Sequence, residues 1–251
     1  MAEVLLRVEN VSKQFGGLRA VDAVTLSILP KRITALIGPN GAGKTTLFSI
    51  VSGFLRADEG RVLYNDSDIT RLPPYQLARL GIARTFQIVQ PFAGLTVRQN
   101  IAVGSYLTHP NRADALQTAD EVARSVDLGS QLERSASTLT VAGRKRLELG
   151  RALATGPKLL LLDEVLAGLN PSEIRDMLPI IRDISNRGVT IVMIEHIMQA
   201  VMSLAEYVFV LAEGRVIARG APADIAADPG VIEAYLGHGA ASRMQAAAGH
   251  A

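Results

Sequence analysis

The chain has 251 residues, of which 48% are hydrophobic, 20% charged and 4% aromatic, a composition that excludes disorder over most of its length. Its 26 basic and 24 acidic residues leave a net charge of +2, which excludes a polycationic surface, so we expect no nucleic-acid partner. The absence of cysteine excludes disulfides, a thiol nucleophile and cysteine-ligated zinc.

The first part of the chain is predicted to contain strands and two helices. Short runs of β-forming residues predict strands over residues 4–8, 24–29, 33–37 and 61–64. Gly16 and Gly17 lie between the first two runs as turn residues, which indicates antiparallel strands. Apolar spacing predicts a helix over residues 45–51, and consecutive prolines at 73 and 74 favour the start of a second helix just before residues 76–79.

The middle of the chain, residues 91–153, has no convincing strand, and we expect it to be a helical subdomain inserted into an α/β core. Its helix-like segments include residues 112–126 and 144–154. Beyond it a helix is predicted over residues 171–186, because Asn170 suits the cap and Pro171 the first helical position. Strands are predicted over residues 158–162, 189–194, 207–212 and 215–218, followed by two short helices.

These elements predict an α/β fold with a mostly parallel sheet, since the runs LLLL and VTIVMI are apolar throughout, as in strands covered on both faces. An N-terminal antiparallel β subdomain and the inserted helical subdomain complete a single domain over residues 1–237. Residues 238–251, rich in Ala, Gly and Ser, are expected to form a flexible tail. The longest apolar run, residues 207–212, is too short for a membrane span, and early charges argue against a signal peptide.

The strongest motif follows the strand predicted over residues 33–37. It matches the pattern G-x-x-x-x-G-K-[ST] in full and precedes a predicted helix, the context that a phosphate-binding loop requires. Glycines let successive backbone N–H groups converge on phosphate oxygens, while Lys44 would neutralise β and γ oxygens and Thr45 would place its hydroxyl on Mg²⁺. The expected nucleotide-binding residues are Gly38, Pro39, Asn40, Gly41, Ala42, Gly43, Lys44, Thr45 and Thr46.

Two consecutive acids follow the apolar strand at residues 158–162. Asp163 is expected at its carboxyl end, where it would hold Mg²⁺, and Glu164, on the opposite side of the pleat, would polarise the attacking water. Acids after a strand also serve as helix caps, but beside a phosphate loop the pair predicts NTP hydrolysis. ATP is favoured over GTP, because the nearest match to the guanine-binding N-K-x-D pattern, at Asn111, lacks the lysine.

The order of further elements over residues 4–237 resembles the ABC-transporter ATPase family. The resemblance implies that Phe15 stacks on adenine, that Gln87, in the string RTFQ, touches Mg²⁺, and that His196 contacts the γ-phosphate. Taken alone, Phe15 could be a core or turn residue and His196 a surface or cap residue. The same resemblance implies ATP and Mg²⁺ as cofactors and assigns catalysis to Glu164 and His196.

The family's L-S-G-G-Q signature falls by the same resemblance on Leu139, Thr140, Val141, Ala142 and Gly143, of which only the leucine is identical. In the family this segment opens a helix and clasps the ATP that is bound to the other subunit. Thr140 keeps a hydroxyl and Ala142 is small, but Val141 is branched where close backbone approach is needed, which predicts a weak clasp. We therefore expect a second, similar ATPase with a fuller signature as partner, although a homodimer can form in isolation.

Within this family, the strings FGGLRAV, ARTFQ, LTVRQN, AGLNP, IEHI and AYLG look like the ATPase subunits of branched-chain amino-acid uptake systems. That resemblance implies integral membrane permease subunits, a solute-binding protein that acts indirectly, and a peripheral location on the cytoplasmic face of the membrane. Related subunits serve urea, amides or aromatic acids, and one exports lipopolysaccharide, so these solutes stay open as alternatives.

Two other classes of protein compete with an importer subunit. An ATP-driven nucleic-acid remodeller would use the basic cluster at residues 144–146, although we expect that cluster to be a solvated helix face. A non-catalytic nucleotide sensor would bind ATP without turnover.

Overall fold

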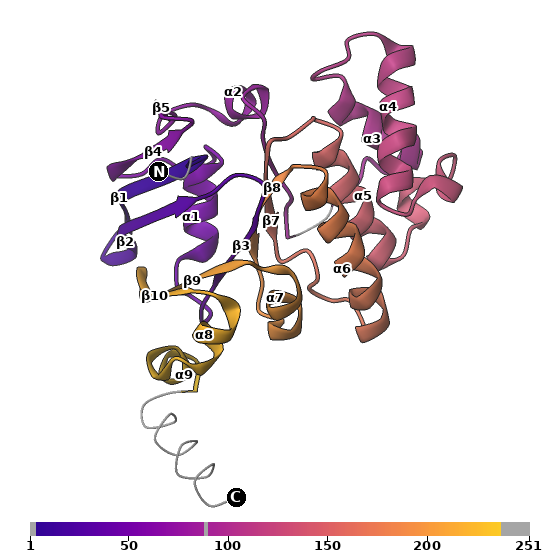
Figure 1. The fold of residues 1–251 in the computed structure, drawn as a ribbon. Helices are drawn as coiled ribbons and strands as arrows, with labels where there is room; N and C mark the ends of the chain where they lie inside the picture. Colours follow the sequence, from indigo (N-terminus) through magenta and orange to yellow (C-terminus); the bar gives the residue numbers. More distant parts are fainter. Residues whose placement is uncertain (1–3, 88–89, 237–251) are drawn as a thin grey trace, which may run out of the picture. The chain divides into compact units, whose positions relative to one another are not determined.

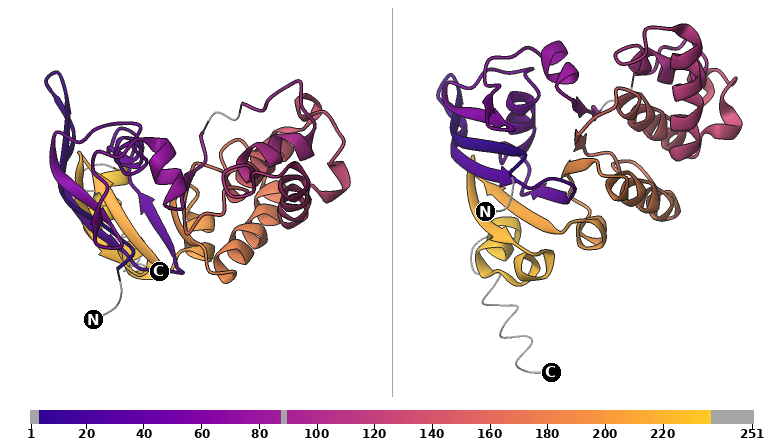
Figure 2. Two further views of the ribbon diagram at one scale, coloured as in Figure 1. Left: turned by 90° about the horizontal axis from the view of Figure 1, so that it is seen from above. Right: turned by 45° about the horizontal axis from the view of Figure 1, so that its top comes forward.

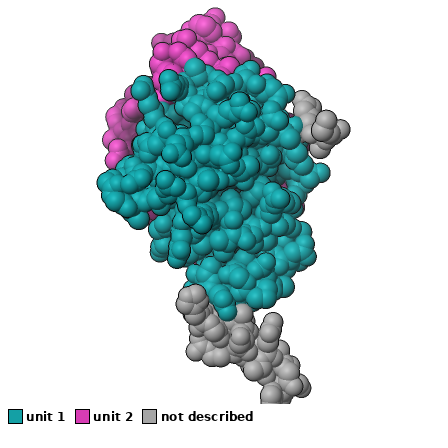
Figure 3. Space-filling view, turned by 90° about the vertical axis from the view of Figure 1, so that its left-hand side faces the viewer, with its two compact units in different colours: residues 1–72, 194–251 teal, residues 73–193 magenta. Residues whose placement is uncertain are grey.

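The chain divides into two compact units, which Figure 3 colours separately. The first unit contains residues 1–72 and 194–251, and the second contains residues 73–193. The computed structural model describes residues 4–87 and 90–236. The tail expected to be flexible, residues 238–251, lies outside the described residues.

The first unit combines an antiparallel sheet with a second group of strands (Figure 1). The antiparallel sheet has the order β2-β1-β4-β5, with β1 (Leu6–Phe15), β2 (Leu18–Ile28), β4 (Glu59–Tyr64) and β5 (Ser67–Asp68). In the second group β3 (Ile33–Ile37) pairs in parallel with β9 (Tyr207–Ala212), which pairs antiparallel with β10 (Arg215–Gly220). The helices described here are α1 (Lys44–Val51), α7 (Met198–Leu204), α8 (Pro222–Ala227) and α9 (Pro229–Leu236).

β1 and β2 form a long hairpin, which confirms the antiparallel prediction but extends both strands beyond the predicted bounds. Phe15 pairs with Leu18, so Gly16 and Gly17 alone make the turn, and Gly16 takes a φ of 57°. A two-residue hairpin turn needs positive φ, which glycine adopts without strain. The register shifts after Val8, and this irregularity interrupts the alternation on which the strand prediction depends.

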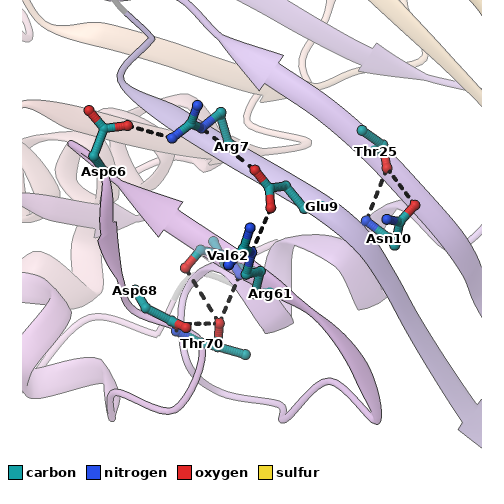
Figure 4. A network of polar contacts seen from close by, with 9 residues as sticks. All are labelled: Arg7, Glu9, Asn10, Thr25, Arg61, Val62, Asp66, Asp68 and Thr70. Atoms are coloured by element: carbon teal, nitrogen blue, oxygen red, sulfur yellow. Dashed lines mark hydrogen bonds and ion pairs between the residues drawn. The ribbon is translucent and has the colours of Figure 1, made fainter.

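A network of polar contacts joins β1 to its neighbours β2 and β4 (Figure 4). Glu9 on β1 pairs with Arg61 on β4 at 2.6 Å and with Arg7 at 3.8 Å. On the neighbouring strand the Thr25 hydroxyl accepts from the backbone N–H of Asn10 at 3.0 Å. Because these groups are exposed, their ion pairs stabilise the sheet only weakly, and the buried face contributes more.

The second unit has a short group of strands and most of the helices (Figure 2). β6 (Ile82–Arg84) pairs in parallel with β7 (Leu159–Asp163), and β8 (Thr190–Ile194), which ends at the unit boundary, lies on the other side of β7. The helices described in this unit are α2 (Pro74–Arg79), α3 (Val97–Ser105), α4 (Arg112–Ser125), α5 (Val141–Leu153) and α6 (Pro171–Asn186). Two 3-10 turns, Gly129–Gln131 and Ala136–Thr138, lie between α4 and α5.

Burial of the strands supports the prediction of parallel strands covered on both faces. Every residue of β3, β7 and β8 is buried. A strand buried on both faces has no polar side to produce alternation, so its sequence is a continuous apolar run. The same runs that predicted these strands therefore also explain their position inside each unit.

Side-chain caps mark where three helices of the second unit begin. Asn170 caps α6 and forms a capping box with Glu173, which confirms the prediction at its first turn. α5 begins at Val141, three residues before the predicted start, because Thr140 caps it. α3 has its own capping box, formed by Thr96 and Gln99, and was not predicted.

α6 is the longest helix described, with 16 residues and Pro179 in its interior. Its buried positions recur on one side, as in a helix that packs against a core. Across residues 4–87 and 90–236, no helix combines the length and the apolarity that crossing a bilayer would require.

Candidate active site

The phosphate loop in the first unit is shaped by glycine backbone at its two ends. Gly38 follows β3 with a φ of 147°, and Gly43 precedes α1 with a φ of 95°. A Cβ at Gly38 would fall on the carbonyl oxygen of Leu211, and one at Gly43 would fall on that of Ala20. At both ends the neighbouring backbone leaves room only for glycine.

Lys44 lies within the curl of this loop. It is the first residue of α1 and is 8% exposed. Its Nζ donates to the carbonyl oxygens of Gly38 and Pro39, each at 2.8 Å. The ammonium group thus lies beside the backbone that follows β3, where a bound phosphate would meet a positive charge.

The N-terminus of α1 is suited to an anion. Gly43 provides its cap position, no side chain among the described residues caps it, and its first turn holds no acid. The N–H groups of the first turn have no partner within the helix, and the helix dipole is positive at this end. Thr45, the residue predicted to hold Mg²⁺, is exposed in this turn.

Phe15 and His196 also belong to the first unit, and both are exposed. Phe15 ends β1, is 49% exposed and has the Lys13 Nζ at 5.6 Å from its ring centre. It is therefore not a core residue, and its ring face can accept a stacked base. His196 lies in the connection between β8 and α7.

Tyr235 on α9 lies at the same loop, although sequence analysis assigns it no role beyond its place in the string AYLG. Burial raises the pKa of its phenol, and the backbone N–H of Gly38, which bonds to the hydroxyl, opposes that rise. The C-terminal helix therefore contacts the first glycine of the phosphate loop.

Asp163 ends β7 and is 2% exposed. Arg84, at the end of the parallel neighbour β6, donates from Nη2 to Oδ2 of Asp163 at 2.7 Å. The backbone N–H of Asp163 donates to the Thr85 hydroxyl at 3.1 Å. A carboxylate this deeply buried requires such a partner, so Arg84 supports Asp163, although the string RTFQ was used to assign a role to Gln87 alone.

Glu164 lies beyond the strand, with a φ of 48°. The prediction that it occupies the opposite side of the pleat is wrong, because the chain leaves the extended conformation at this residue. Its carboxylate accepts from Nε2 of Gln87 at 2.7 Å. The structure thus brings together two predicted residues that are 77 positions apart.

The segment at the place of the signature opens α5, as the resemblance implied. The Thr140 hydroxyl accepts from the backbone N–H of Gly143 at 3.1 Å and so caps the helix. Val141 is 55% exposed, whereas Ala142 and Gly143 are buried. The branched side chain of Val141 therefore stands on the surface at the first helical position.

The basic cluster at residues 144–146 is not the solvated helix face that was predicted. Arg144 is exposed, but Lys145 is 6% exposed, and Arg146 pairs with Asp127 at 2.6 Å. The Nζ of Lys145 donates to the backbone carbonyl oxygens of Gln87 and Glu164, each at 3.2 Å. The prediction fails at Lys145 because its acceptors are backbone atoms, which no side-chain pattern reveals.

Glu148, one turn after Lys145, is a buried acid that the sequence did not single out. Burial raises the pKa of its carboxyl group, while Arg151, the Phe86 backbone N–H and Lys145 lower it. Arg151 approaches the carboxylate to 3.2 Å. A buried charge is costly unless it has such partners, so Arg151, the Phe86 N–H and Lys145 offset part of the cost of burying Glu148.

The predicted site residues divide between the two units. The phosphate loop, Phe15 and His196 lie in the first unit, and Gln87, Asp163, Glu164 and the segment at residues 140–143 lie in the second. Among the residues that the structure describes, no group of three or more His, Asp or Glu side chains is placed to hold a metal ion.

Two family models match the chain. One, described as ABC transporter, matches residues 21–167, and another, described as Branched-chain amino acid ATP-binding cassette transporter, matches residues 215–241. The first match covers more than half of the chain and includes the phosphate loop, Asp163 and Glu164. The chain therefore belongs to the ABC transporter family and is an ATP-binding, ATP-hydrolysing subunit of that class.

Similar curated proteins extend this match to nearly the whole chain. The high-affinity branched-chain amino acid transport ATP-binding protein LivG of Escherichia coli (strain K12) is 38% identical over 94% of this chain and 99% of LivG. BraF of Pseudomonas aeruginosa, a protein with the same description, is 37% identical with the same two coverages. A probable LivG of Archaeoglobus fulgidus is 38% identical over 93% of this chain and 95% of that protein.

Similar solved structures confirm the predicted fold class. A nucleotide-free ATP-binding cassette from an ABC transporter has a TM-score of 0.84 and 33% identity, covering 92% of this chain and 98% of its own. The ADP conformation of MJ1267, an ATP-binding cassette of an ABC transporter, has a TM-score of 0.85 and 33% identity, with coverages of 94% and 99%. The α/β fold with a phosphate loop is therefore that of an ABC ATPase.

Proposed function

We propose that the chain powers the uptake of branched-chain amino acids, or of closely related small solutes, as an ATPase subunit of an importer. The observation that carries this proposal is the similarity to LivG, which is 38% identical over 94% of this chain and 99% of LivG. The match of residues 215–241 to a branched-chain amino acid transporter model supports it from the C-terminal part.

The proposal implies partners that this chain does not itself provide. We propose that it binds integral permease subunits and lies peripherally on the cytoplasmic face of the membrane. A solute-binding protein would deliver the solute to the permease from the other side. This chain would therefore supply ATP-derived energy without contacting the solute.

In the proposed cycle each residue has a distinct role. The N–H groups of residues 38–45 and the Lys44 ammonium would bind the phosphates, and Phe15 would stack on the adenine. Glu164 would accept a proton from the attacking water, oriented by its bond to Gln87 at 2.7 Å. His196 would contact the γ-phosphate.

Magnesium fits the donors that the sequence predicted. The Thr45 hydroxyl, the Gln87 amide and the Asp163 carboxylate are all oxygen ligands, the kind that Mg²⁺ prefers. Mg²⁺ usually keeps several waters and binds through one or two carboxylates and phosphates, so a dedicated acidic cluster is not required. When bound, it would neutralise charge that develops on the phosphate oxygens.

The divergent signature favours a heteromeric ATPase pair. Val141 is 55% exposed at the first position of α5, where its branched side chain would keep a partner's nucleotide from the backbone. We propose that a similar but non-identical ATPase with a fuller signature completes this chain's own half-site. The purified chain alone would then hydrolyse ATP slowly, and a brisk, cooperative rate from an isolated homodimer would contradict the pairing.

Reconstituted transport tests the proposed function. Proteoliposomes would contain this chain, its permease subunits and a second ATPase, with the solute-binding protein added outside. We expect ATP-dependent accumulation of labelled leucine, and none with Lys44→Ala. Accumulation of urea or an aromatic acid without leucine would overturn the branched-chain assignment but keep the ATPase assignment.

A further inference from the structure

We propose that Lys145 is a positioning residue for ATP hydrolysis, and that with Glu148 and Arg151 it forms a charged stripe on α5 that holds Gln87 and Glu164 in place. The inference rests on the proposed function, in which Glu164 accepts a proton from the attacking water and its bond to Gln87 orients it. It assigns a role to a helix that is otherwise expected to serve only the signature.

The three residues of the α5 stripe are spaced three apart, so they lie along one side of the helix. Lys145 donates to the Gln87 and Glu164 carbonyl oxygens, each at 3.2 Å. Glu148 accepts a hydrogen bond from the backbone N–H of Phe86, which is next to Gln87. This bond lowers the pKa of the Glu148 carboxyl group.

The third residue of the stripe extends the contact further along the same segment. Nη1 of Arg151 donates to the carbonyl oxygen of Gln90 at 3.0 Å, and its guanidinium lies 4.7 Å from the centre of the Phe92 ring. The stripe therefore contacts Phe86, Gln87, Gln90 and Phe92, and so joins these four residues to α5.

Lys145 also holds Glu164 in an unfavourable conformation. A residue other than glycine with a φ of 48° is strained and persists only where its surroundings fix it. The Glu164 carbonyl oxygen is fixed by Lys145 at 3.2 Å and by the Ala167 N–H at 3.1 Å. The left-handed turn that presents the Glu164 carboxylate thus depends in part on a side chain from another helix.

The contacts of Lys145, Gln87 and Glu164 form a closed ring. Lys145 joins their two backbones, and the Gln87 amide joins their two side chains at 2.7 Å. A carboxylate held at both its backbone and its side chain has little freedom, and activation of water requires such positioning. Loss of Lys145 would open the ring without removing either reacting group.

The burial of Lys145 indicates that these bonds matter. A lysine only 6% exposed loses hydration that must be replaced by hydrogen bonds or an opposite charge. Two carbonyl oxygens replace it, and the attraction between Lys145 and Glu148 lowers the Glu148 pKa against burial. By contrast, the neighbour Arg144 is exposed, and it donates to the Ser137 carbonyl oxygen at 3.1 Å.

Steady-state hydrolysis by full-length variants tests this role. Lys145→Met keeps the side-chain length but removes the charge and the N–H donors, whereas Lys145→Arg keeps the charge and the N–H donors. We expect Lys145→Met to lower kcat by about tenfold or more, with KM for ATP within about twofold of wild type, because positioning affects the reaction step more than binding. Lys145→Arg should recover kcat to within about threefold. Lys158→Met, an exposed lysine in the same unit, is the matched control and should not change kcat.

Two further variants keep the test decisive. If Lys145→Met does not fold, Lys145→Gln, which retains an N–H donor, should fold and show an intermediate kcat. If Lys145→Met has the kcat of wild type while Glu164→Gln is inactive, the positioning role of Lys145 is overturned but the proposed function stands. An equal loss of kcat in Lys145→Met and Lys145→Arg, with a parallel loss of thermal stability, would also overturn the positioning role, because a merely structural role predicts that result. Full activity of Glu164→Gln would instead overturn the proposed function.

Discussion

The phosphate loop and the Asp163 and Glu164 cluster are built in different ways. In the loop, the shape comes from backbone, since a Cβ at Gly38 or Gly43 would fall on a neighbouring carbonyl oxygen. In the cluster, the shape comes from side chains that three separate segments contribute, near residues 84–87, 145–151 and 163–164. The two ends of the loop therefore have no room for a side chain, whereas the cluster depends on charge balance and on bonds that single substitutions can remove one at a time.

The largest effect is expected in the loop. Gly43→Ala should destabilise the fold by about 3 kcal/mol or more and abolish ATP binding, because the new Cβ would meet the Ala20 carbonyl oxygen at a φ of 95°. Gly41→Ala is the matched control: its φ is 80°, but nothing lies within 4 Å of the added Cβ, so we expect only about 1 kcal/mol. Chemical denaturation measures the free energy of unfolding of each variant. Equal losses of stability in Gly43→Ala and Gly41→Ala would contradict the explanation that the Ala20 carbonyl oxygen causes the larger loss.

A smaller effect is expected when the partner of a buried carboxylate is removed. Arg84→Met should destabilise the fold by about 3 kcal/mol, because it leaves Asp163, 2% exposed, without the guanidinium at 2.7 Å. Adding Asp163→Asn to Arg84→Met should restore part of that loss, since the buried charge is then gone. Arg79→Met, at an exposed position on α2, is the control. Additive losses in the double variant would contradict the pairing.

The smallest effect concerns pH. Burial raises the pKa of Glu148 above its ordinary 4.5, although Arg151 and other neighbours oppose it. The folded state therefore holds this proton more tightly, so the group's contribution to stability is present below pH 4.5 and is lost as pH rises through the raised pKa. Between about pH 4 and pH 7, the stability of Glu148→Gln should therefore rise relative to that of wild type, because the variant has no carboxyl group to lose a proton. Denaturation curves at both pH values measure the free energies of unfolding, and Glu133→Gln, at an exposed position, is the control. If the difference in stability between Glu148→Gln and wild type does not change with pH, the raised pKa of Glu148 is contradicted.

The same contrast explains how much of the molecule could be predicted from sequence. The loop, β7 and α6 were predictable because consecutive residues determine them: a glycine pattern, an apolar run and an Asn170 cap. The roles of Arg84 and Lys145 could not be predicted. The partner of Arg84, Asp163, lies 79 positions away, and Lys145 donates to a backbone oxygen 58 positions away. β6 was missed because its three residues give too short a run for any period to appear.

Glu164 shows where pattern reasoning was correct about the residue but wrong about its geometry. The consecutive acids at residues 163 and 164 identified Glu164 as a candidate. Its predicted direction, opposite to that of Asp163, assumed that the chain stays extended at Glu164. Its φ of 48° depends on contacts with Lys145 and Ala167, which come from the tertiary structure.

The central claim is that nucleotide binding and hydrolysis depend on separate groups, Lys44 with the loop backbone for the first and Glu164 for the second. Equilibrium binding of ATP and single-turnover hydrolysis, measured on the same full-length variants, test it most directly. Lys44→Ala should weaken ATP binding by at least about tenfold, whereas Glu164→Gln should bind ATP as wild type does and hydrolyse it at least about a hundredfold more slowly. Wild-type hydrolysis by Glu164→Gln, or unchanged ATP binding by Lys44→Ala, would contradict the account.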